Sequence, residues 1–167
     1  MLELKSISQE SIPRALEKVE RYRLLNEPWQ AESICLDILQ IEPENQQALV
    51  MLLLALTDQF GLGSAGLFKR AQEVIPRLHS EYERAYYRGI ICERRAEAQL
   101  SHGATGSGVI AHHWLREAMG LYEKAGAIRP QGNDDAVLRW NTCARMIMRN
   151  PYPVPAEERA EVFVTME

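Results

Sequence analysis

The sequence predicts an all-α protein, and three observations support this fold class. Apolar residues recur three and four positions apart along most of the chain, which is typical of amphipathic helices. Prolines and glycine-rich segments separate these stretches. No segment has the alternation of apolar and polar residues that indicates a half-buried strand. The predicted helices cover residues 11–25, 29–41, 46–60, 67–79, 81–100, 109–128 and 133–149.

The first two predicted helices are bounded by prolines. Pro13 lies in the first turn of the first helix, where its missing N–H is harmless. Pro28 ends that helix, because a residue that precedes proline disfavours the helical conformation. Pro43 ends the second helix. The expected inner faces are Leu16, Val19 and Leu24 in the first helix, and Ala31, Ile34, Cys35, Ile38 and Leu39 in the second.

The third and fourth predicted helices flank a glycine-rich loop over residues 61–66. Asn45 is expected to be the N-cap of the third helix, because its side chain can accept from an unpaired N–H of the first turn. Pro76 falls inside the fourth helix and should kink or shorten it, since proline removes a helical hydrogen bond.

The last three predicted helices are long and are separated by a second glycine-rich loop and by Pro130. We expect residues 101–108 to form that loop, and to be the most mobile internal segment. Asn133 is expected to cap the seventh helix, whose first turn has two acidic residues that suit the positive end of the helix dipole. The expected inward residues of the sixth helix are Trp114, Leu115, Ala118, Leu121, Tyr122 and Ala125.

Composition excludes several classes of function. The 167 residues suit one domain, and the net charge of -4 argues against a nucleic-acid partner, because phosphate binding usually needs a basic face. The longest apolar stretch, residues 48–56, has fewer than half of the ~20 residues needed to span a bilayer. Three widely spaced cysteines without a CxxC pair suit a reducing compartment. We therefore expect a cytoplasmic protein with no membrane association.

The chain is expected to divide into a helical domain at 1–150 and an extended or partly disordered tail at 151–167. Three prolines open the tail, and residues 162–164 are Val-Phe-Val. This apolar segment could lie in a groove of its own chain or of a neighbouring copy, or it could be a disordered terminus.

One internal repeat is visible, and it carries a family resemblance. Ala118, Tyr122, Ala125 and Pro130 have the residue types and spacing of the second helix of a tetratricopeptide repeat. Weaker copies lie in earlier helices, at Ala31, Cys35, Ile38 and Pro43 and at Ala71, Ile75 and Leu78, while Gly89 could supply the small residue of a first helix. The chain therefore resembles the tetratricopeptide-repeat family over residues 11–130.

The spacing departs from that family. The distance from Ala31 to Ala71 is 40 residues and from Ala71 to Ala118 is 47, against a family repeat of about 34. The resemblance implies a right-handed array of seven antiparallel helices, in which three degenerate repeats are followed by a capping helix at 133–149. A compact helical bundle without repeats is the alternative.

The resemblance also implies a function. First helices of such repeats line a concave groove, so the protein would be a non-catalytic scaffold or adaptor that binds a peptide or protein segment without a cofactor. Arginine and tyrosine are common at binding hot spots. The expected groove residues are Arg23, Leu54, Asp58, Tyr86, Ile90, Arg94 and Arg139. The lysine and asparagine set of the family's carboxylate clamp has no match here.

The sequence leaves two alternative functions open. The protein could be a structural homodimer that assembles through the groove or the tail. It could also bind a metal through His102, His112 and His113 with Glu117, although no His-Glu-x-x-His or paired-cysteine motif is present. Enzymatic catalysis is not expected, because the cysteines lie on apolar helix faces and no serine lies in a Gly-x-Ser-x-Gly elbow.

Overall fold

The computed structural model describes residues 1–63 and 66–150, and over these residues the fold is all-α, as predicted. It contains no strand in that part of the chain. Three short 3-10 turns, η1, η2 and η3, cover Gln9–Ser11, Phe60–Leu62 and Ile75–Arg77. The α-helices are α1 (Ile12–Leu24), α2 (Pro28–Ile41), α3 (Gln46–Thr57), α4 (Leu67–Val74), α5 (Glu81–His102), α6 (Ser107–Ala127) and α7 (Asp135–Arg149).

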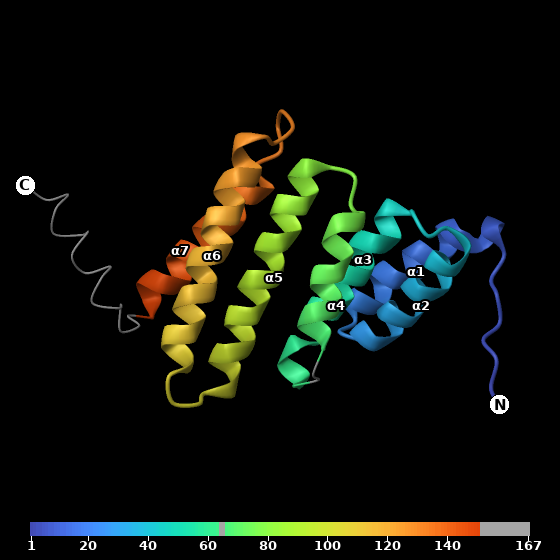
Figure 1. Cartoon of the computed structure of the whole chain (residues 1–167), viewed down its shortest axis with the longest axis horizontal. Coiled ribbons are helices and arrows are strands. Elements are labelled where there is room, and N and C mark those ends of the chain that lie inside the picture. Colours follow the sequence, from blue (N-terminus) through green and yellow to red (C-terminus); the bar gives the residue numbers. More distant parts are fainter. Residues whose placement is uncertain (64–65, 151–167) are drawn as a thin grey trace, which may run out of the picture.

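The helices pack in the order in which they occur in the chain. Each of α1 to α6 contacts the helix that follows it, and α3 also contacts α1 and α5. Helices α4 to α7 run alternately up and down, with α1 and α2 at one end of the molecule and α7 at the other (Figure 1). Helix α3 lies between α1 and α5 and contacts both, so side chains that are far apart in the chain lie on one face of the molecule.

Local sequence signals account for several helix ends. The Asn45 side chain accepts a hydrogen bond from the Ala48 N–H at 2.9 Å, which confirms the predicted cap of α3. Pro76 also acts as predicted, since α4 stops at Val74 and a 3-10 turn follows. Helix α3 ends at Thr57, three residues earlier than predicted, and η2 follows it.

Two expectations about the long helices are wrong. The predicted loop at 101–108 is much shorter, because α5 continues to His102 and α6 begins at Ser107. Gly103 and Gly106 adopt positive φ angles of 60° and 84°, so glycine allows the chain to reverse within this short connection. At α7 the N-cap position belongs to Asp134, although the Asn133 side chain accepts from the Asp135 N–H at 3.0 Å.

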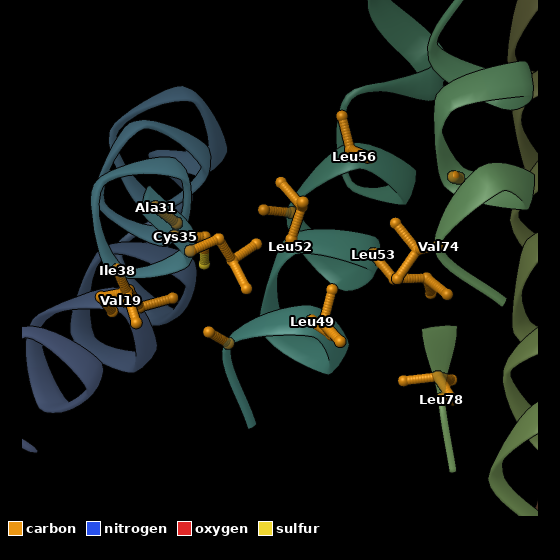
Figure 2. Packing of buried hydrophobic residues seen from close by; sticks show 14 of the residues in the cluster. Val19, Ala31, Cys35, Ile38, Leu49, Leu52, Leu53, Leu56, Val74 and Leu78 are labelled. Carbon is orange, nitrogen blue, oxygen red and sulfur yellow. The ribbon is translucent and has the colours of Figure 1, made fainter. Parts of the chain in front are cut away.

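The buried side chains form two clusters. The first joins α1 to α4, and Figure 2 shows Cys35 and Ile38 of α2 on one side of α3 and Val74 of α4 on the other. The second joins α5, α6 and α7. Helix α5 belongs to both, because Ile91 faces the first cluster and Ile90 the second.

The predicted apolar face of the first helix is only partly correct. Val19 is fully buried and Leu16 is half-buried against the first cluster, but Leu24 is 82% exposed. Leu24 is the last residue of α1, where the chain turns toward α2.

A partly buried ion pair connects α2 and α4 beside the first cluster. Glu32 of α2 accepts hydrogen bonds from Gln59 Nε2, at 2.7 Å, and from the Arg70 guanidinium of α4. A buried carboxylate requires such partners, because an unpaired charge in the interior is costly. The contact therefore holds α2 and α4 together across one end of α3.

In the part of the chain that the structure describes, no helix has the length and apolar character needed to cross a membrane. The tail at 151–167, with its Val-Phe-Val segment, lies outside the described residues.

Candidate functional site

The candidate site is a groove where α1, α3 and α5 meet. The Arg23 Nε of α1 donates to Asp58 Oδ2, which directly follows α3, at 2.8 Å. Arg94 of α5 brings its Nη2 to 4.0 Å from the other carboxylate oxygen of Asp58. These residues line a cavity of about 510 Å³. A single carboxylate thus lies between two guanidinium groups from different helices.

The two arginines of the groove have N–H donors that no residue in the described part of the chain accepts. Arg94 Nη1 donates to Glu97 Oε2 at 3.2 Å, while its Nε is buried and has no partner among the described residues. Arg23 uses only its Nε on Asp58. A guanidinium group has five N–H donors, so each arginine keeps donors for an incoming carboxylate or phosphate, apart from the buried Arg94 Nε.

Apolar side chains also line the groove, together with Glu20 and Asn26. Val50 and Leu54 of α3 form its floor with Tyr87 of α5, and the exposed Leu24 lies on its rim. A surface that combines a few apolar contacts with arginine is typical of a protein-binding site.

The structure brings four of the seven predicted groove residues together and places three elsewhere. Arg23, Leu54, Asp58 and Arg94 line the same cavity. Tyr86 instead stacks on Tyr82 and packs against Tyr122 in the second cluster. Its neighbour Tyr87 lines the groove, so the predicted register on α5 differs by one position. The expectation also fails for Ile90, which is 1% exposed and offers no surface to a partner.

Arg139, the remaining predicted residue, belongs to a buried polar network. Its Nη1 donates to Glu93 Oε1 at 3.1 Å, and the Tyr122 hydroxyl donates to Glu93 Oε2 at 2.5 Å. Burial lowers the pKa of Arg139, but the Glu93 carboxylate raises it and the net shift is upward. Burial and the same carboxylate raise the pKa of Tyr122. Glu93 is 1% exposed, so this network connects α5, α6 and α7 rather than meeting a partner.

The three cysteines are free thiols in apolar surroundings. Burial raises the pKa of Cys35 and Cys143 from the usual 9.0 to about 12, and that of Cys92 to about 11. The reactive thiolate is therefore scarce at neutral pH. This environment is typical of structural cysteines.

The histidines that could have formed a metal site do not form one in the described part of the chain. No group of three His, Cys, Asp or Glu side chains there is arranged to hold a metal ion. The His113 ring packs against Trp114, and His112 is buried in α6. His102 belongs to the last turn of α5.

A second, larger cavity, which the sequence did not predict, lies between α4, α5 and α6. Arg84 and Arg88 line it from α5, and Arg116 and Lys124 line it from α6. Their spacing of four and eight residues places each pair on one helix face and was a signal available in the sequence.

No family model, curated protein or solved structure matches the chain.

Proposed function

We propose that this protein is a non-catalytic adaptor whose groove between α1, α3 and α5 binds an acidic segment of a partner protein. The observation that carries the proposal is the meeting of Arg23, Asp58 and Arg94 in one cavity. We further propose that it acts in the cytoplasm, where its reduced thiols would be stable.

Charge is the first part of the recognition. Arg94 pairs with Glu97 at 3.2 Å, but its contact with Asp58, at 4.0 Å, is long for an ion pair. A glutamate or aspartate of the partner would complete the pairing by accepting from the free guanidinium donors. Such charge-assisted hydrogen bonds give orientation as well as affinity.

Apolar contact is the second part. Leu24, Leu54 and Tyr87 offer an anchor beside the charged pair. A peptide with an acidic residue next to a large apolar residue fits this arrangement. The contact of α1 with α3 and of α3 with α5 is what a tetratricopeptide-like array would provide, and it supports this use of the groove.

The test is selection from a displayed peptide library, followed by titration of the selected peptide. We expect wild-type protein to select peptides with an acidic residue beside an apolar one. Arg23→Gln with Arg94→Gln should abolish their binding. Arg145→Gln with Arg149→Gln removes the same charge from α7, outside the groove, and should leave binding unchanged. Equal loss in both double variants would contradict the proposal.

A second variant separates binding from folding, since the Arg23–Asp58 pair also connects α1 to the end of α3. Leu24→Glu changes a residue that is already exposed, so the core is unaffected. It should weaken peptide binding, whereas Leu4→Glu, at an exposed position before α1, should not. If Leu24→Glu bound the peptide as tightly as the wild type, Leu24 would not be part of the binding site.

A homodimer is the second candidate function, and the surface of α7 favours it. Val137, Leu138 and Met148 are exposed apolar residues on this helix, which packs mainly against α6 among the described residues. Light scattering should then give twice the mass of one chain, and Leu138→Glu should halve it. A monomeric wild-type protein would exclude this function.

A further inference from the structure

A cavity of about 740 Å³ lies between α4, α5 and α6. Sites for small molecules commonly enclose about 300–1,000 Å³, so this one is large enough for a ligand such as a nucleotide. It shares no lining residue with the groove of Arg23 and Arg94.

The cavity is strongly basic although the chain is acidic. Arg84, Arg88, Arg116 and Lys124 line it, and Glu117 is the one acidic residue among its lining. The whole chain has 19 basic and 23 acidic residues, so composition alone does not explain the cluster. Like charges one helical turn apart, as at Arg84 and Arg88, destabilise a helix unless something compensates them.

Three of these cations are not neutralised by the described part of the chain. Arg88, Arg116 and Lys124 form no hydrogen bond or ion pair with any residue there. Arg84 is held in place, because its Nη1 donates to the carbonyls of Leu78 and His79 at 2.7 and 2.9 Å. The cavity therefore combines one anchored guanidinium with three cations that are free to bind an anion.

One wall of the cavity is apolar. Pro76 and Leu121 line it together with Trp114, whose indole is fixed by an edge contact with Phe68 at 5.5 Å. Gly120 lies between the two basic residues of α6, and a Cβ there would meet no atom within 4 Å. The space beside Gly120 is open to a ligand with a charged part and an apolar part.

We propose that this cavity binds a phosphate ester of nucleotide size. Its phosphates would accept from Arg88, Arg116 and Lys124, and its apolar ring would lie against Pro76 and Trp114. Guanidinium and ammonium groups on two facing helices suit several phosphate oxygens at once. This site is independent of the proposed function of the groove.

Calorimetric titration of the full chain with ADP, in the presence of a chelator, tests the proposal. We expect ADP to bind to the wild-type protein. The affinity of Arg88→Gln with Lys124→Gln for ADP should be at least about tenfold lower, because each substitution removes a charge-assisted contact with the phosphates. Arg145→Gln with Arg149→Gln, with the same loss of charge on α7, should bind like the wild type. Absence of binding to wild-type protein, or equal weakening in both double variants, would overturn the proposal.

Three further experiments determine where the ligand binds. A Cβ at Gly120 would meet no atom within 4 Å, so Gly120→Leu should place its side chain in the open space, fold normally and lose ADP binding. Inorganic pyrophosphate should compete with ADP, because the phosphates provide the main contacts. Arg23→Gln with Arg94→Gln should bind ADP normally. Unchanged ADP binding by Gly120→Leu, or its loss in the groove variant, would place the ligand elsewhere and contradict the assignment.

Discussion

Gly89 of α5 lies directly against the ring of Tyr122 of α6. A Cβ on Gly89 would be 2.5 Å from Tyr122 Cε1, 2.8 Å from Cδ1 and 2.9 Å from Cζ. The ring cannot move away freely, because it is buried and its hydroxyl donates to Glu93. The absence of a side chain at position 89 therefore sets the separation of α5 and α6, the two longest helices.

Gly89→Ala should destabilise the protein by about 1–3 kcal/mol, because overpacking a core costs more than the improved helix propensity returns. Urea unfolding measures the change. Gly120→Ala is the matched control, since it adds the same methyl group to the neighbouring helix in open space. The control should stabilise the protein by about 0.5–1 kcal/mol. Changes of the same sign in both variants would show that the Tyr122 contact is unimportant.

Arg139→Met should cost about 3 kcal/mol, the lower end for breaking a buried ion pair, because part of the Arg139 side chain reaches solvent. The loss comes from leaving the Glu93 carboxylate with Tyr122 as its one remaining partner among the described residues. Arg145→Met, an exposed position on the same helix, should change the free energy of unfolding by less than about 0.5 kcal/mol. Similar values for the two variants would contradict a structural role for the network.

Stability should fall as the pH rises from about 9 toward 12. The thiol pKa is 9.0 in an ordinary environment but about 12 for folded Cys35 and Cys143, so only the unfolded chain loses these protons near pH 10. In that range each thiol should lower the free energy of unfolding by about 1.4 kcal/mol per pH unit.

Urea unfolding at pH 8, 9 and 10, in the presence of a reductant, measures this slope. Below pH 8 the thiols should have no effect, because they are protonated in both states. The variant Cys35→Ala with Cys143→Ala should have a shallower slope even if it is less stable throughout. Parallel curves for the variant and the wild type would assign the alkaline loss to other groups.

Asn45→Ala should destabilise the protein by about 1 kcal/mol, because the Ala48 N–H loses its acceptor at the start of α3. Ser80→Ala tests the same effect at α5, where the Ser80 hydroxyl accepts from the Glu83 N–H at 3.2 Å. Chemical denaturation checks both variants. If Asn45→Ala were as stable as the wild type, water would satisfy the Ala48 N–H as well as the Asn45 side chain does.

The sequence predicted the helices well where a local residue determines the outcome. Asn45 acts through a hydrogen bond within one turn and Pro76 through its missing N–H, so neither effect depends on the tertiary fold. The loop at 101–108 was predicted too long, because composition alone does not show that the turn needs positive φ only at Gly103 and Gly106.

The site was less predictable because it depends on helix rotation. A shift of one residue on α5 exchanges Tyr86 for Tyr87 at the groove, since neighbouring helical residues point about 100° apart. Ile90 was expected to be accessible, but α5 packs against both clusters and buries it. The cations of the second cavity lie on two facing helices, and their convergence appears only when α5 and α6 are paired.

Amide chemical-shift mapping with an acidic peptide selected by the wild-type protein tests the central proposal most directly. We predict that the perturbed amides surround Arg23, Leu54, Asp58 and Arg94, and that the peptide also protects α1, α3 and α5 from hydrogen exchange. Perturbations confined to α7, or to the basic cavity around Arg88 and Lys124, would contradict the assignment of the groove as the partner-binding site.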